Sequence, residues 1–185
     1  MKIELTHLFG PKADESPLGY YRRLAEANAL WSWKDLASMI QVSASRTGLL
    51  GSPDHVAAKL GIPAAWTGGL AQREQHLRAL RSLHRSRTDA VCPECLAEDI
   101  YLRVSWEHAY VTACSKHRLR LVDHCSACGD SLSPHRERLA QCRCGTMLMQ
   151  LRSMPATDAQ MWLSSLLSTE GTHSGEVTPD VTGVK

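Results

Sequence analysis

The seven cysteines of this chain constrain its fold most, because all of them lie between positions 92 and 144 in closely spaced pairs. Together with one histidine they form two C-x-x-C pairs, one C-x-x-H pair and one C-x-C pair: Cys92, Cys95, Cys114, His117, Cys125, Cys128, Cys142 and Cys144. Two thiolates separated by two residues across a tight turn can bind one ion. A following loop can bring a second pair of ligands to the same ion. Eight ligands suffice for two four-coordinate sites. The sequence therefore predicts two structural zinc ions.

The order of the pairs predicts how they are shared between the sites. The first site takes the ligands from positions 92 to 117, and the second takes those from 125 to 144. Interleaved pairing between the sites remains an alternative, as does replacement of His117 by His108 or His124. Gly129 and Gly145 follow cysteines of the second site, where a turn can require a positive φ.

An odd cysteine count also bears on the compartment. The N-terminal residues lack a charged segment followed by an apolar one, so no secretory signal is expected. No apolar run approaches the eighteen residues of a membrane span. Since reducing compartments keep thiols free, an odd number of cysteines there favours metal over disulfides. We expect a cytoplasmic bacterial protein, associated with the nucleoid and not with a membrane.

Helix signals recur through the first 88 residues. Ser16 before Pro17 predicts a helix start with an N-cap and a proline at the first helical position. Ser32 and Asp35 form a capping-box pattern before a second helix. Residues 43–51 are interpreted as a loop.

The helical periods predict which side chains of these two helices are buried. Arg22 and Arg23 fall outside the apolar stripe of the first helix and are expected in solvent. Leu36, Met39 and Ile40 form the expected buried stripe of the second.

A third start at Ser52 and Pro53 precedes a short helix that ends at Gly61. A second helix is expected from about residue 63, and a short helix, a glycine turn and a following helix are typical of a helix-turn-helix. Gly68 and Gly69 are expected to interrupt that following helix. Residues 70–87 then predict a long helix.

Five arginines of this segment are candidate nucleic-acid contacts: Arg73, Arg78, Arg81, Arg85 and Arg87. With Glu74 as the one acidic residue, residues 72–87 carry five positive charges and one negative, a net +4, whereas the whole chain carries +2. Clustered arginine supplies phosphate affinity without sequence preference. A solvated helix face has the same composition, and both interpretations remain open.

The expected fold class is α-rich with small zinc-ribbon modules. A helical, helix-turn-helix-like domain over residues 1–88 is followed by two zinc-stabilised ribbons over 89–152. A short helix starting near Thr157 and Asp158 falls within residues 153–167, and a polar tail over 168–185 is predicted to be disordered.

The chain offers little for catalysis. Glu98 and Asp99 form a carboxylate pair, but no open metal site or Ser/His constellation accompanies them. No phosphate-binding glycine loop of the G-x-x-x-x-G-K type is present either. Tyr101 and Trp106 are expected to fill the small core, with base stacking as the alternative. We therefore predict a protein that is not an enzyme.

The cysteine region closely resembles the TniQ family. The resemblance rests on CPECLAEDIYLR at residues 92–103, Trp106, VTACSKH at 111–117, LRLVDHCSACG at 119–129 and CRCG at 142–145. The segments ESPL at 15–18 and RLAEAN at 23–28 are similar to the opening helix of the family, so the resemblance extends over roughly residues 1–167. Several relatives carry a further C-terminal domain, so this chain is either a compact member or the front part of a longer one.

The resemblance implies a target-selection protein with a helix-turn-helix and tandem zinc ribbons. TniQ-like proteins do not cut DNA; they mark the target and recruit an AAA+ transposition regulator. The target is DNA at an attachment site in some relatives and an RNA-guided effector complex in others. The alternative function is a stand-alone zinc-ribbon, helix-turn-helix transcription factor. A zinc hydrolase is disfavoured, because both predicted sites are closed by four protein ligands.

Overall fold

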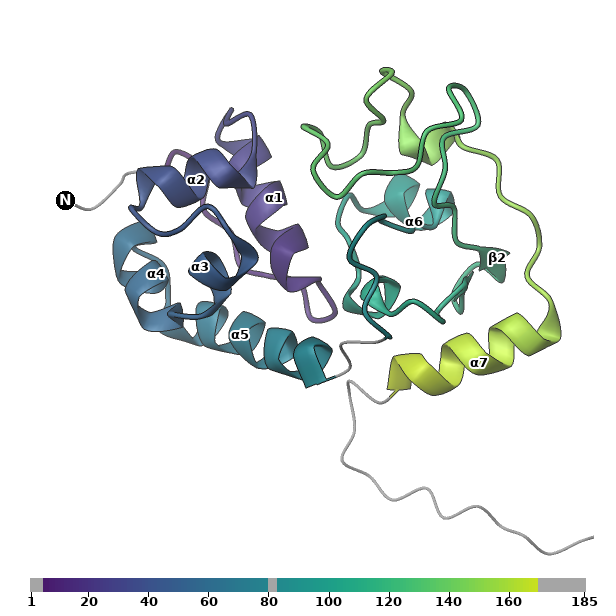
Figure 1. Cartoon of the computed structure of the whole chain (residues 1–185), viewed down its shortest axis with the longest axis horizontal. Coiled ribbons are helices and arrows are strands. Elements are labelled where there is room, and N and C mark those ends of the chain that lie inside the picture. The colour runs from purple at the N-terminus through teal and green to yellow at the C-terminus, as the bar shows by residue number, and fades with distance from the viewer. Residues whose placement is uncertain (1–4, 80–82, 170–185) are drawn as a thin grey trace, which may run out of the picture.

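The computed structural model describes residues 5–79 and 83–169, and it shows two lobes side by side (Figure 1). The first lobe is built from helices α1 to α5. The second begins after residue 83 and contains every cysteine. Each lobe has its own cluster of buried apolar side chains.

The helical lobe consists of α1 (Pro17–Ala27), α2 (Trp33–Met39), α3 (Arg46–Leu50), α4 (Pro53–Leu60) and α5 (Ala64–Ala79). Its core is formed by apolar residues from all five helices, and the largest of them are fully buried: Tyr20, Tyr21, Leu24, Leu36, Ile40, Leu49, Leu60 and Leu70. Each helix turns its apolar side chains toward this core, and their burial supplies most of the driving force for folding of the lobe.

The helix starts follow the predicted capping chemistry. The Ser16 side chain accepts a hydrogen bond from the Gly19 amide, and Pro17 occupies the first turn of α1. Ser32 and Asp35 form the predicted capping box at the start of α2. Gly61 ends α4 with a φ of 69°, a left-handed conformation that glycine adopts without strain. The helix-turn-helix order α4, glycine turn, α5 is therefore present.

Three expectations for the helix bounds and the apolar packing of this lobe were wrong. The predicted loop over residues 43–51 contains α3, because Ser45 caps the Gly48 amide and Leu49 and Leu50 are buried. Met39 is 43% exposed, while its predicted companions Leu36 and Ile40 are buried. The short α2 ends at Met39, so its apolar stripe is narrower than the sequence period suggests.

The third error concerns α5. Helix α5 runs without a break from Ala64 to Ala79, through both glycines that were expected to interrupt it. A Cβ built on Gly68 or Gly69 would meet no heavy atom within 4 Å, so neither glycine is required by packing. The helix is continuous because α4 and the core side chains of α5 hold it on both sides of the glycine pair. The predicted helix over residues 70–87 is therefore displaced toward the N-terminus.

Replacing Gly68 with alanine should stabilise the protein. Gly68 is exposed in the interior of α5 with open space around it, so alanine adds no clash. The substitution reduces the conformational freedom of the unfolded chain and should add about 0.5–1 kcal/mol to the free energy of unfolding. Urea unfolding measures the change. Gly61→Ala is the matched control and should lose about 1 kcal/mol, because its φ is positive. Destabilisation by Gly68→Ala would contradict a continuous α5.

The cysteine lobe contains little regular structure. Its elements are α6 (Pro93–Glu98), the 3-10 turn η2 (Val104–Glu107), strands β1 (Ala113–Cys114) and β2 (Leu119–Arg120), the 3-10 turn η3 (Leu148–Gln150) and α7 (Asp158–Thr169). Strands β1 and β2 pair antiparallel, with Ala113 opposite Arg120 and Cys114 opposite Leu119. Trp106 and Tyr101 are 4% and 8% exposed, so both fill the core as expected.

Helix α7 begins at Asp158, in agreement with the helix start predicted at Thr157 and Asp158. The Ser164 hydroxyl accepts hydrogen bonds from the Thr112 and Ala113 amides at 3.1 and 3.0 Å, which docks the helix on β1. The tail predicted to be disordered lies almost entirely outside the described residues, which end at Thr169. Across residues 5–79 and 83–169, no helix has the length and apolar character that a membrane crossing requires.

Candidate metal centres

The structure brings the eight predicted ligand side chains together in two groups. Within the described residues, Cys92, Cys95, Cys114 and His117 form one group, and Cys125, Cys128, Cys142 and Cys144 form the other. In each group the ligand atoms all lie within 4.8 Å of one another. The pairing follows the chain order, so the interleaved alternative is not the one that the structure adopts.

The first group is built from α6 and the hairpin of β1 and β2. Cys92 and Cys95 flank the first turn of α6, whereas Cys114 ends β1 and His117 lies in the turn before β2. The Cys95 sulfur lies 3.5 Å from the Cys114 sulfur and 3.3 Å from Nδ1 of His117. Nδ1 of His117 is also 3.5 Å from the Cys92 sulfur, so this ring nitrogen faces the three thiols.

Glu98 orients the histidine of the first group. Nε2 of His117 lies 3.2 Å from a carboxylate oxygen of Glu98, while Nδ1 faces the sulfurs. A carboxylate bound to the outer nitrogen of a metal-ligating imidazole fixes its tautomer and raises its basicity. Lys116 also pairs with Glu98 and lowers its pKa. Sequence reasoning missed this role, although the position of Glu98 three residues after Cys95 on the same helix was a usable signal.

The second group is built from two tight turns. The Cys125 and Cys144 sulfurs are 3.7 Å apart, as are those of Cys128 and Cys142. Gly129 and Gly145 have φ values of 79° and 94°, so both predicted positive-φ turns are confirmed. Cys125 and Cys142 are buried, while Cys128 and Cys144 are exposed at the rim.

These distances fit a tetrahedral ion. Sulfur ligands about 2.3 Å from a tetrahedral zinc lie about 3.8 Å apart, and a histidine nitrogen lies somewhat closer to the sulfurs. The observed sulfur separations of 3.5 to 3.7 Å match that geometry. Four converging side chains leave no position for water or substrate. Each group could therefore hold a four-coordinate metal ion of structural type.

The two alternative histidines lie elsewhere. His108 is buried outside both groups, and its Nδ1 accepts a hydrogen bond from the Tyr110 amide. His124 is largely exposed and its ring contacts the carboxylate of Asp123 at 2.8 Å. His117 is thus the histidine that joins the cysteines.

The five candidate arginines do not form one stripe. Arg81 lies outside the described residues. Arg85 is directed at the backbone, because its guanidinium donates to the Ala109 and Val111 carbonyls. Arg73 donates to the Lys12 and Glu15 carbonyls, which ties α5 to the N-terminal segment.

The remaining two arginines are accessible. Arg78 is 43% exposed on α5 and pairs with Glu74 at 3.0 Å. Arg87 is exposed in the segment that joins the lobes. It lies beyond the end of α5, although the sequence predicted a helix up to this residue.

A largely buried carboxylate from the cysteine lobe, Glu107, anchors the helical lobe. Arg46 donates to Glu107 at 2.6 Å, and Nε2 of His84 lies 2.9 Å from the same oxygen. The Ser16 hydroxyl donates to the other oxygen of Glu107. Burial alone would raise the pKa of Glu107, but the positive charge of Arg46 and these hydrogen bonds hold it below its usual value.

A second largely buried carboxylate, Asp89, binds two arginines. Arg22 of α1 donates to Asp89 at 2.7 Å, and Arg136 donates to the same oxygen. The expectation that Arg22 lies in solvent was wrong, since its side chain is only 6% exposed. Its partner is 67 residues away in sequence, so no helical period could reveal it. Burial opposes ionisation of Asp89, yet the two guanidinium groups lower its pKa.

The fold and the two cysteine groups define a helical protein whose second lobe contains two four-ligand clusters that could each hold a metal ion. The TniQ family matches residues 8–121, which is more than half of the chain. This chain belongs to the TniQ family, and it is a transposition-associated protein. The matched segment includes the first metal centre and ends before Cys125, so the second centre lies outside it. No curated protein matches the chain.

Proposed function

We propose that this protein is a transposition adaptor that contacts target nucleic acid and recruits an AAA+ regulator. Family membership over the helical lobe and the first metal centre is the observation that carries this proposal. TniQ-like proteins mark a target for a separate transposase, so the adaptor supplies contacts and performs no bond cleavage. A cytoplasmic, nucleoid-associated location follows from that role.

Zinc is the proposed occupant of both centres. The first centre offers three thiols and one imidazole, and the second offers four thiols. Soft ligands of this kind at tetrahedral spacing are typical of structural zinc. Zinc would hold α6 against the β1–β2 hairpin in the first centre and tie two turns together in the second. Its contribution is to fold the cysteine lobe, so that the surface offered to a partner has a defined shape.

The proposed nucleic-acid surface includes a groove between α5 and the first metal centre. The groove has a volume of about 800 Å³, and Arg73, His76, Arg103 and Lys116 line it. Asp14 is the acidic residue among the lining side chains. An excess of positive charge along an open groove suits a phosphate backbone. Arg78 and Arg87 are exposed outside this groove and are separate candidate phosphate contacts.

Replacing Arg78 and Arg87 together with alanine should weaken nucleic-acid binding and reduce its salt dependence. Two lost phosphate contacts lower the slope of log K against log salt by roughly two for duplex DNA. Fluorescence anisotropy at several salt concentrations measures the slope. Arg152→Ala, an exposed arginine of the cysteine lobe, is the matched control. An unchanged slope in the double variant would show that these arginines are only a solvated face.

The adaptor role is tested by reconstitution with an AAA+ transposition regulator from the same host. The zinc-loaded chain should bind that ATPase and retain it on target nucleic acid. Tight binding to a defined duplex without any partner, combined with failure to bind the ATPase, would instead establish the stand-alone transcription factor.

A further inference from the structure

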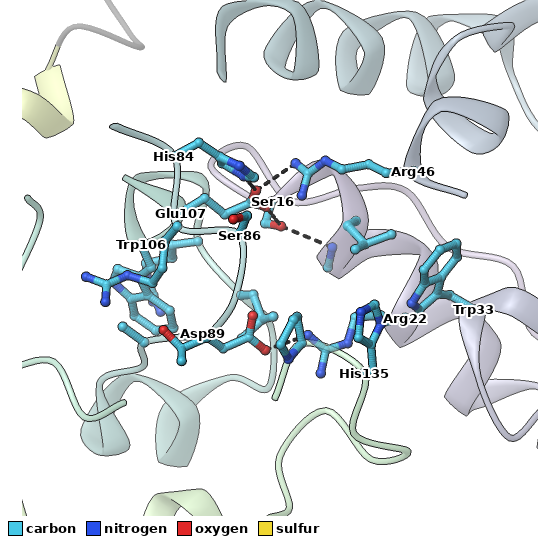
Figure 2. A pocket seen from close by; sticks show the side chains of 18 of the residues that line it. Ser16, Arg22, Trp33, Arg46, His84, Ser86, Asp89, Trp106, Glu107 and His135 are labelled. Carbon is cyan, nitrogen blue, oxygen red and sulfur yellow. Dashed lines mark hydrogen bonds and ion pairs between the residues drawn. The ribbon is translucent and has the colours of Figure 1, made fainter. Parts of the chain in front are cut away.

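A cavity of about 310 Å³ lies between the two lobes (Figure 2). The cluster of Ser16, Arg46, His84 and Glu107 lies at one end of this cavity, and Arg22, Asp89 and His135 lie at the other. Trp33 and Trp106 lie on opposite sides (Figure 2). The interlobe cavity is separate from both metal centres, because none of the eight ligands lines it.

The lining side chains carry an excess of positive charge. The cations are Arg22, Lys34, Arg46, Arg85 and Arg103, and the carboxylates are Asp89 and Glu107. With both histidines neutral, five positive charges against two negative leave +3. Asp14 and Asp123 approach Arg103 and Arg85 from outside at 3.4 and 3.8 Å, while Arg136 adds a positive charge behind Asp89. Glu74 also pairs with Arg46 at 2.6 Å, so with these four groups counted the surroundings of the cavity carry +1.

Three of the lining arginines have donors that the protein does not use. Nη2 of Arg22, Nε of Arg85 and Nη1 of Arg103 are buried, and they have no hydrogen-bond partner in the part of the chain that the structure describes. Buried polar groups are almost always paired, and an exception commonly marks a missing water or ion. All three arginines line the interlobe cavity, and an anion near Arg22 would supply the partner that its Nη2 lacks.

The end of the cavity near Arg22 is the most suitable place for an anion. Arg22 is 6% exposed, and one of its nitrogens is committed to Asp89 while Nη2 is unpaired. Trp33, Lys34 and His135 accompany Arg22 both here and in a smaller adjoining cavity, so the two spaces share this wall. Lys34 is exposed and His135 comes from the opposite lobe. An anion at this wall would be held by both lobes.

We propose that the interlobe cavity binds a phosphate group between Arg22, Lys34 and His135. A phosphate carries more negative charge than a carboxylate and presents several acceptor oxygens, which suits a guanidinium, an ammonium and an imidazole converging from different directions. The volume exceeds that of phosphate alone and falls in the range of small-ligand pockets. The phosphate therefore belongs to a larger molecule, either a nucleic-acid strand or a free phosphate ester.

Calorimetric titration of the zinc-loaded full chain with inorganic phosphate, at constant ionic strength, tests the proposal. We expect saturable binding at one site per chain. Lys34→Ala should raise the dissociation constant about tenfold, as expected for loss of one charge-assisted hydrogen bond. Lys34 is exposed, so this variant should fold even if Arg22→Gln does not. Arg152→Ala makes the same charge change at an exposed residue that does not line the cavity, and it should leave the dissociation constant unchanged.

A short DNA oligonucleotide distinguishes the two sources of the phosphate. Competition between the oligonucleotide and inorganic phosphate assigns the site to a nucleic-acid strand, whereas independent binding assigns it to a free phosphate ester. The absence of saturable phosphate binding would overturn the proposal and leave water as the occupant. Equal weakening by Lys34→Ala and Arg152→Ala would overturn it as well, and so would preferential binding of an acidic peptide.

Discussion

Replacing Cys95 with serine is expected to unfold the cysteine lobe around the first metal centre. Cys95 is fully buried in the core of that lobe, and its sulfur approaches both Cys114 and His117. Apparent binding free energies of structural zinc are about 10–16 kcal/mol in small zinc-finger peptides, and that energy is folding energy. Around this centre the lobe has only the two-residue strands and the six-residue α6, so little regular structure there can replace the metal. Loss of the Cys95 ligand should therefore cause local unfolding around the first centre.

Amide NMR spectra of the two proteins measure this effect. Resonances from α6 and the β1–β2 hairpin should collapse in the variant, while those from the α2–α4 core should persist. Ser115→Ala is the matched control, because Ser115 is exposed inside the same C-x-x-H turn and is not a ligand. A Cys95→Ser variant with the wild-type spectrum and stability would refute a structural role for the first centre.

Replacing Asp89 with asparagine should have the second largest effect. The substitution preserves shape but removes the charge that holds Arg22 and Arg136 together beneath the surface. Removing one partner of a buried ion pair leaves uncompensated charge and costs about 3–5 kcal/mol. Because Arg22 belongs to α1 and Arg136 to the cysteine lobe, the loss falls on the contact between the lobes. Denaturant unfolding at neutral pH measures it, with exposed Glu137→Gln as the matched control.

The loss of stability caused by Asp89→Asn should depend on pH, and the pKa of Asp89 fixes the direction of that dependence. The folded state holds the pKa of Asp89 below its usual value, so the carboxylate stabilises the protein above the unfolded pKa of about 4. That contribution is lost as the pH falls through the folded pKa. The stability difference between wild type and Asp89→Asn should therefore be constant near neutral pH and narrow below about pH 4. A difference that grows on acidification would contradict the ion-pair assignment.

Local chemistry explains which features could be predicted from the sequence. The cap at Ser16, the capping box at Ser32 and the left-handed Gly61 each depend on a few adjacent residues. The cysteine pairs are also local, since a C-x-x-C turn presents both sulfurs to one side. For these reasons the helix starts at Ser16, Ser32 and Ser52 and the gathering of eight ligand side chains were predicted correctly.

Contacts between distant segments could not be predicted in the same way. Arg22 was placed in solvent because its partner Asp89 is 67 residues away. Arg85 was expected on a helix face, whereas it binds carbonyls of the cysteine lobe after α5 has ended. Tertiary packing also overrode the low helix propensity of Gly68 and Gly69. Each of these errors occurred where the two lobes meet or where a neighbouring helix supplies the stability.

The zinc content of the protein tests the central claim, that two closed four-ligand centres fold the cysteine lobe. Native mass spectrometry of the chain, with the zinc identity checked by elemental analysis, should find two ions per wild-type chain. Cys95→Ser and Cys128→Ser should each retain one, because they remove ligands from different centres. One zinc ion per wild-type chain, or none, would contradict the account.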